Sequence, residues 1–350
     1  MAEKSVPGEG LGGHPEDAER SRDGRHWYSI RRLRYGLTVS VNGEEISLDT
    51  RKPKGITLVS HAHFDHSLSL GERGEKYTTP GTLSYFSALR EPYGEIKTLK
   101  IGSKIKMDDV EIGFLESGHI FHSSQFLMDF GDISILYTGD LNPKGGLLAE
   151  PAEREECDIL IIDSTYGSPK YVFPEREETE EEIRNWVEEE VRRGKIPVLG
   201  VYTIGKAQEI TKLLCETQLT VIVHPRINKV NSKLEEEFSL NLGDYLSSGN
   251  IEAIKIIEDG EFVLLVPPNL GHRAIRKLEE MSGRKASYRR VSGWEIFGEG
   301  FPLSDHGDFP SLMEFVSDIS PRLVYTVFGH SQRFAKEIKR TLGIEARGLP

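Results

Sequence analysis

Hydrophobic positions along the chain first follow the two-residue period of β-strands. Leu37–Val41 and Glu44–Leu48 flank Asn42-Gly43, a dipeptide typical of two-residue turns, and together they predict a β-hairpin. The runs 126–130 and 133–137, separated by Gly131-Asp132, predict a second hairpin. Further short apolar runs predict strands at 56–60, 97–101, 110–115, 158–162 and 323–328.

Other segments have apolar residues three or four positions apart, which is typical of helices. This pattern predicts helices at 80–90, 175–193, 206–215, 229–238, 274–281, 310–316 and 332–342. Between residues 168 and 300 these helices alternate with predicted strands at 196–202, 219–223 and 262–266. We therefore expect an inserted α/β domain at 168–300, between a first domain part at 27–167 and a C-terminal part at 301–350.

Composition limits the class of protein. Residues 1–26 contain almost no large apolar side chains, so we expect a disordered tail there. No run approaches the ~20 apolar residues of a membrane span and the N-terminus lacks an apolar signal core, which predicts a soluble, cytoplasmic protein without a membrane partner. Only Cys157 and Cys215 are cysteines, too few for a disulfide framework.

The formal net charge of −12 argues at first against a nucleic-acid partner, because phosphate binding needs local positive potential. Acidic residues that bind divalent cations would reverse the local sign, however. Basic clusters also occur at 31–34 and 284–290. Nucleic acid therefore stays open as a partner.

The densest group of polar residues follows the predicted strand 56–60. Four side chains able to bind a metal occur within six residues, at His61, His63, Asp65 and His66. Imidazole nitrogens and carboxylates suit Zn²⁺ or a similar first-row ion. Because alternate residues leaving a strand point the same way, His61 and His63 can share one metal while the other two reach a second.

The ends of other predicted strands supply further candidates. A two-metal hydrolytic centre needs ligands from several strand ends and one bridging carboxylate. His119 completes the first ligand set and Asp140 is the expected bridge, while Asp49 and Asp163 could orient imidazoles from behind. The predicted metal ligands are His61, His63, Asp65, His66, His119 and Asp140.

Three motifs resemble the metallo-β-lactamase fold, a four-layered αββα hydrolase: HAHFDH at 61–66, SGHIFHSSQF at 117–126 and YTGDL at 137–141. Two more, DSTYG at 163–167 and SDHGDF at 304–309, resemble the β-CASP nucleases of that superfamily. The stretches 163–174, 200–210 and 301–316 are most similar to the Artemis/Apollo DNA-repair branch. The STYG and IGKAQE segments also resemble the RNA-processing branch, which includes ribonuclease J.

The resemblance implies an α/β fold and a zinc-dependent nuclease, with 5′ to 3′ exonuclease action on single-stranded DNA ends. It also implies Asp65, Asp163 and His306 as catalytic residues, with His306 beside the scissile phosphate as a positioned acid. Lys206 could contact a phosphate at its helix start. The alternatives are an RNA-processing nuclease, a small-molecule metallo-hydrolase and an inactive binding subunit.

Two positions depart from the family pattern. His122 stands where relatives usually have a small residue, and it could touch metal or substrate. RNA-processing relatives complete the second ion's shell with a histidine where this chain has Phe328, and His330 lies two residues further on as another candidate ligand or substrate contact. We therefore expect one tightly held Zn²⁺ and a weaker second site, open to Mn²⁺ or Mg²⁺.

Overall fold

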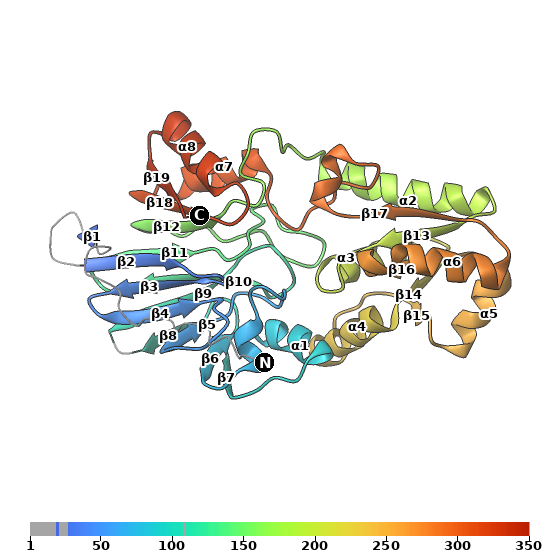
Figure 1. The fold of residues 1–350 in the computed structure, drawn as a ribbon, viewed down its shortest axis with the longest axis horizontal. Helices are drawn as coiled ribbons and strands as arrows, with labels where there is room; N and C mark the ends of the chain where they lie inside the picture. The colour runs from blue at the N-terminus through green and yellow to red at the C-terminus, as the bar shows by residue number, and fades with distance from the viewer. Residues whose placement is uncertain (1–18, 21–26, 108, 350) are drawn as a thin grey trace, which may run out of the picture.

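The computed structural model of the protein describes residues 19–20, 27–107 and 109–349. Two seven-stranded sheets and one five-stranded sheet form its framework (Figure 1). The tail expected at 1–26 lies outside the described residues, except for β1 (Glu19–Arg20), which pairs with β2. Among the described residues, no helix has the length and apolar character needed to cross a membrane.

The first two sheets contain the predicted hairpins. The first sheet has the order β1, β2 (Trp27–Arg32), β3 (Leu37–Val41), β4 (Glu44–Leu48), β5 (Ile56–Leu58), β6 (Glu75–Thr78), β7 (Glu95–Thr98). The second has the order β19 (Glu345–Gly348), β18 (Leu323–Val327), β12 (Ile159–Asp163), β11 (Ser134–Tyr137), β10 (Ser124–Asp129), β9 (Val110–Glu116), β8 (Lys104–Met107). β3 pairs antiparallel with β4, and β10 with β11, so both hairpins are confirmed.

These two sheets pack face to face through one apolar core. Side chains from both sheets are fully buried in it, and the rings of Phe114 and Phe126 meet edge to face at 5.0 Å. Helix α1 (Pro80–Leu89) packs on the outer side of the first sheet, whereas α7 (Phe309–Ile319) and α8 (Ser331–Leu342) cover the second. This αββα layering is the predicted fold class.

The third sheet is parallel throughout and lies within residues 168–300. Its order is β15 (Tyr245–Ser247), β14 (Thr220–Val223), β16 (Phe262–Val266), β13 (Ile196–Gly200), β17 (Ala286–Arg290). One face is covered by α2 (Arg176–Arg192), α3 (Lys206–Leu214) and α4 (Pro225–Phe238), the other by α5 (Ile251–Asp259) and α6 (Gly271–Ser282). Short 3-10 helices occupy Leu68–Gly71, Pro268–Leu270 and Gly293–Phe297.

Strand direction decides where the polar loops meet. β4 to β7 are parallel in the first sheet, and β9, β11, β12 and β18 run the same way in the second. The carboxyl ends of each set therefore share one edge. At this edge Gly139 has φ +58°, and a Cβ there would lie 2.7 Å from the Ser60 Cβ, so only glycine lets the two sheets approach so closely.

The unit built on the third sheet meets the other two sheets at a seam beside this edge. Helix α4 packs against α1 there (Figure 1). Val230 and Leu234 of α4 are buried together with Ala62, Tyr85 and Ile120 of the first two sheets and their loops. The seam therefore places segments far apart in sequence next to the residues that follow β5 and β9.

Candidate metal centre

Four side chains from three strand ends converge on one point. The His63 Nδ1 atom lies 3.2 Å from His61 Nε2 and 3.0 Å from His119 Nε2. Asp140 Oδ2 lies 3.4 Å from His61 Nε2 and 3.5 Å from His119 Nε2. Hydrogen bonding among neutral imidazoles does not explain why three ring nitrogens converge on one another and on a carboxylate, so the arrangement needs another explanation.

A bound cation gives that explanation. In a tetrahedral Zn²⁺ site with ligands at about 2.0 to 2.1 Å, the ligand atoms are about 3.3 Å apart. The four separations given above, 3.0 to 3.5 Å, match that value, and all four atoms lie within 4.8 Å of one another. The chemistry of the donors, three imidazoles and one carboxylate, also suits zinc, so the residues present fit the ion that the sequence predicts.

The protonation states agree with ligand roles. Burial, with the neighbouring charge of His66, lowers the pKa of His61 well below its usual value. Burial and His306 lower the pKa of His119 in the same way, and burial lowers the pKa of His63 to about 4. These imidazoles are therefore neutral near pH 7, which is the form that binds a metal.

His66 lies near the other oxygen of Asp140 with Asp65 beside it, although Asp65 belongs to none of the convergent ligand groups among the described residues. The His66 Nε2 atom lies 3.3 Å from Asp140 Oδ1 and 3.7 Å from Asp65 Oδ2. Burial lowers the pKa of His66, but the charges of Asp140 and Asp49 outweigh burial and raise that pKa to about 10. This shift indicates a negative potential around His66, and a second cation would neutralise that potential.

Hydrogen bonds from behind hold these imidazoles in place. Asp49, with φ +54°, places Oδ2 at 2.8 Å from His66 Nδ1. The Ser60 hydroxyl donates a hydrogen bond of 2.6 Å to the same oxygen. The Ser60 oxygen also lies 3.0 Å from His61 Nδ1. Asp49 therefore lies behind a candidate ligand imidazole, as the sequence predicts, whereas the sequence analysis does not predict the contact from Ser60.

Two backbone carbonyl groups supply further contacts of this kind, one from the loop before α3 and one from the segment before α7. The Ile204 carbonyl oxygen lies 3.1 Å from His63 Nε2, and the Asp305 carbonyl oxygen lies 2.8 Å from His119 Nδ1. Gly205, which directly follows Ile204, has φ +82°, and a Cβ there would come within 2.3 Å of the Ile120 side chain. Glycine therefore lets this loop approach the candidate ligands closely. Backbone carbonyls carry no sequence signature, so neither contact is foreseeable from residue types.

His306 and Asp163 form a pair beside the same carboxylate. The His306 Nδ1 atom lies 2.8 Å from Asp163 Oδ2, and Asp163 Oδ1 accepts hydrogen bonds from Thr165 N at 2.8 Å and Thr165 Oγ1 at 2.7 Å. The free His306 Nε2 atom then lies 3.8 Å from Asp140 Oδ2. Asp163 fixes the ring so that Nε2 faces the convergence point.

Lys206 occupies a different environment from the one predicted. Its side chain is buried and its ammonium group lies 3.0 Å from Glu209 Oε2, with a second ion pair to Asp305 Oδ1. Arg176 adds to the group at 2.7 Å from Glu209 Oε2. These charges satisfy one another, so the ammonium group is engaged with carboxylates and is not free for the predicted phosphate contact.

The two histidines that depart from the family pattern lie away from the centre. His122, with φ +59°, stacks on Phe121 at 4.1 Å and contacts Phe238 at 4.9 Å. His330 precedes α8 and places Nε2 at 3.2 Å from the Tyr171 hydroxyl oxygen. Among the described residues, neither belongs to a group whose ligand atoms converge. The geometry therefore argues against both as metal ligands.

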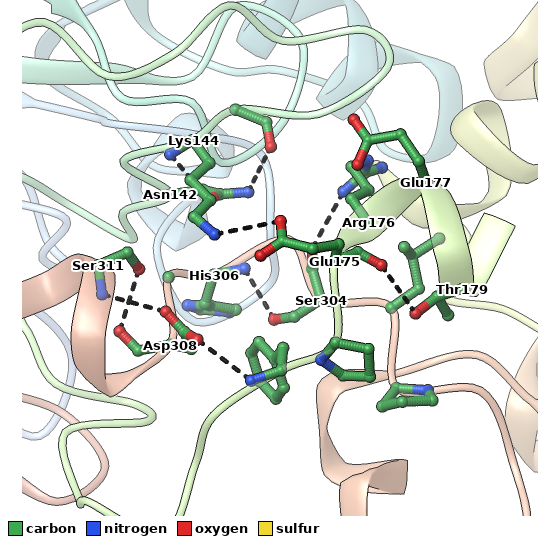
Figure 2. A pocket seen from close by; sticks show the side chains of 16 residues that line it. Asn142, Lys144, Glu175, Arg176, Glu177, Thr179, Ser304, His306, Asp308 and Ser311 are labelled. Carbon is green, nitrogen blue, oxygen red and sulfur yellow. Dashed lines mark hydrogen bonds and ion pairs between the residues drawn. The ribbon is translucent and has the colours of Figure 1, made fainter.

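The convergent side chains open into a cavity of about 510 Å³. Behind His306 lies a smaller cavity of about 140 Å³ (Figure 2). There the Ser304 hydroxyl accepts a hydrogen bond from His306 N at 3.0 Å, and Asp308 accepts one from Ser311 N at 3.1 Å. These bonds hold the segment that carries His306 against the start of α7.

Several known proteins are similar to this chain in sequence. No family model matches the chain. The 5′ exonuclease Apollo of Gallus gallus is 26% identical over 324 residues, which cover 89% of this chain and 67% of Apollo. The cleavage and polyadenylation specificity factor subunit 3 of Dictyostelium discoideum is 21% identical, covering 80% of this chain and 47% of that protein. The chain is related to the β-CASP nucleases of the metallo-β-lactamase fold.

A third relative of this chain is a protein named "Probable DNA ligase" from Opitutus terrae, 29% identical over 310 residues. That match covers 85% of this chain and 29% of the Opitutus protein, so the chain spans less than a third of that relative's length. A crystal structure of a protein of unknown function from Enterococcus faecalis V583 superposes with a TM-score of 0.58 at 14% identity. It covers 86% of this chain and 92% of that one, which shows the same fold.

Proposed function

We propose that this β-CASP chain is a zinc-dependent nuclease that hydrolyses phosphodiester bonds. The observation that carries the proposal is the convergence of four ligand atoms, all within 4.8 Å of one another and with four of their separations at 3.0 to 3.5 Å, beside the His306–Asp163 pair. Bound zinc would supply Lewis acidity toward the phosphate oxygens. The nuclease relatives support this chemistry.

The roles of the chain's own residues follow from their positions. His61, His63, His119 and Asp140 would hold the tighter ion. Asp65 and His66 would hold a weaker second ion together with the other oxygen of Asp140, and Mn²⁺ or Mg²⁺ could replace zinc there. His306, oriented by Asp163 through Nδ1, would carry a proton on Nε2 for the leaving oxygen.

We propose single-stranded DNA ends as the substrate, cleaved from 5′ to 3′ during DNA repair in the cytoplasm. Support comes from the Opitutus relative, whose name specifies DNA, and from Apollo, whose name specifies 5′ exonuclease action. RNA is the second candidate, because an RNase J-like protein of Methanocaldococcus jannaschii is 34% identical over 109 residues. We also propose that residues 168–300, which enclose the third sheet, form the inserted β-CASP domain.

Matched oligonucleotides test the proposal. Purified protein is incubated with identical 5′-labelled DNA and RNA strands, with and without chelator, and the products are resolved on a gel, where 5′ to 3′ action releases the label as a mononucleotide and 3′ to 5′ action gives a ladder. We expect chelator-sensitive degradation of DNA, abolished in His63→Ala and Asp65→Asn. His306→Ala should lower turnover by about 10²- to 10⁴-fold while keeping its metal content.

Three results would contradict parts of this proposal. Full activity in a folded, metal-depleted protein would remove the metal from the chemistry. Faster degradation of RNA than DNA would reverse the substrate assignment. Loss of bound metal in His306→Ala would move His306 from the acid role to the ligand set.

A further inference from the structure

Two exposed aromatic side chains lie where the metal cavity opens into a second cavity. Phe64 is 56% exposed and Tyr202 is 46% exposed. Both line the cavity of about 510 Å³ that contains the candidate ligands, and both also line a neighbouring cavity of about 180 Å³. Large aromatic rings exposed at the mouth of a polar site contribute little to stability, so binding of a substrate explains them better.

Two arginines border the second cavity. Arg90 directly follows α1, and Arg226 lies in the first turn of α4. Within the part of the chain that the structure describes, neither guanidinium forms an ion pair with a carboxylate, and the Arg90 guanidinium lies 4.6 Å from the centre of the Phe64 ring. Partial burial and the charge of Arg226 lower the pKa of Arg90, so two like charges are held close together.

This pair stands out because the protein as a whole is acidic. In a chain whose 56 Asp and Glu residues outnumber its 44 Lys and Arg residues, carboxylates are plentiful as neighbours. Two close arginines without such neighbours create a local positive potential, which attracts an anion. The two sides of the site come from different units, since α1 belongs to the first and α4 to the unit with the third sheet (Figure 1).

We propose that Phe64, Tyr202, Arg90 and Arg226 form a binding subsite for single-stranded DNA leading away from the metal cavity. Bases would stack on the two rings, and the backbone phosphates would pair with the two guanidinium groups. The subsite rests on the proposed function, because it would bind a strand whose scissile bond lies at the candidate metal centre. It adds the part of the substrate that the metal ligands do not contact.

Binding of a short strand tests the subsite without requiring hydrolysis. The full chain, as isolated, is titrated into fluorescent oligothymidylate with phosphorothioate linkages, which resist cleavage, and anisotropy is recorded at several salt concentrations. Arg90→Ala/Arg226→Ala should bind at least tenfold more weakly. The slope of log Kd against log salt should fall by about 1.4, because two phosphate contacts are lost at about 0.7 each.

A matched control removes the same charge elsewhere. Arg273 and Arg276 are exposed on α6, away from the seam, so Arg273→Ala/Arg276→Ala should bind within twofold of wild type. For the stacking role, Tyr202→Ala should weaken binding by roughly fivefold or more, whereas Tyr202→Phe should retain wild-type affinity. Melting temperatures check that each variant is folded.

The outcomes separate this inference from the proposed function. Equal affinity in Arg90→Ala/Arg226→Ala and in its control would overturn the subsite. A loss confined to oligouridylate would overturn its assignment to DNA. Hydrolysis of bis(p-nitrophenyl) phosphate by the wild type is measured separately, and its failure with every divalent ion would contradict the nuclease proposal while leaving the binding result standing.

Discussion

Asp140 links the two groups of potential ligands through its two oxygens. Oδ2 faces His61 and His119, whereas Oδ1 lies 3.3 Å from His66 Nε2. Among the described residues, only Asp65, His66 and Asp140 are proposed for the second ion, fewer than the four contacts of a closed zinc site. Phe328 stands beside it, with its ring centre 5.1 Å from that of His66. The second ion should therefore be the weaker one.

Phe328→His tests this asymmetry. Phe328 has φ +64°, a conformation in which histidine is enriched over most residues, so the backbone should accept the substitution. We expect wild type to keep one tightly bound zinc after dialysis and Phe328→His to keep two, measured by metal analysis of the dialysed protein. Phe328→Leu, which adds no imidazole, is the control. Two equivalents in dialysed wild type would show that the second site is closed without this change.

Residue types in the sequence predict some of the contacts at the candidate metal centre but not others. The strand-end motifs predict that His61, His63, His119 and Asp140 come together, because parallel strands bring their ends to one edge. The carbonyl oxygens of Ile204 and Asp305 could not be predicted, since every residue has a carbonyl group and only the folded loop aims it.

Among the elements, α3 connects the unit of the third sheet to the candidate ligands. Lys206 at its start pairs with Asp305, whose own carbonyl lies 2.8 Å from His119 Nδ1. Glu209 and Arg176 complete a buried group of alternating charges around this contact. The position of α3 and the orientation of His119 are therefore mechanically coupled.

Lys206→Met should disturb both stability and zinc binding. Removing one member of a buried ion pair leaves charge unpaired, so we expect the free energy of unfolding to fall by about 3 kcal/mol. Zinc affinity should fall by roughly 10- to 100-fold, because the Asp305 carbonyl loses its anchor. Thermal melts and zinc titrations measure the two effects.

Lys212→Met, further along α3, serves as the control, because Lys212 forms no ion pair with a carboxylate among the residues described. The double variant Lys206→Met/Asp305→Asn removes both charges of the ion pair and should regain part of the stability. A lower melting temperature with unchanged zinc affinity would reduce Lys206 to a purely structural role.

Sequence periodicity predicts long apolar elements better than short polar ones. The hairpin of β3 and β4 and the strand β16 match their predicted bounds. Helix α4 begins at Pro225, four residues before the predicted start. Proline is favoured at the first position of a helix, but this first turn lacks the apolar periodicity on which the prediction depended. β17 (Ala286–Arg290) lies within the basic cluster 284–290, and its partly exposed, polar side chains give no strand signal.

At the scale of the whole molecule, the apolar cores divide near the proposed domain boundary at residue 300, with Phe301 and Leu303 still packed in the third-sheet core. Two cores join the first two sheets to each other and to α7 and α8. Two others draw all their buried members from residues 183–303 and enclose the third sheet. A smaller cluster at the seam includes Val230 and Leu234 together with residues of the first unit. The third-sheet unit thus has a core of its own and a limited apolar contact with the rest.

This division predicts that residues 174–303, expressed alone, fold cooperatively, because both cores of the third sheet are complete within that segment. Thermal unfolding followed by circular dichroism should show one sharp transition with mixed α/β signal. The isolated segment should also bind a hydrophobic dye, because Val230 and Leu234 lose their partners at the seam. Val230→Ser/Leu234→Ser should abolish dye binding without removing the transition. A broad, non-cooperative melt of the isolated segment would show that its cores depend on the first two sheets, and the boundary at 168–300 would then not separate independent folding units.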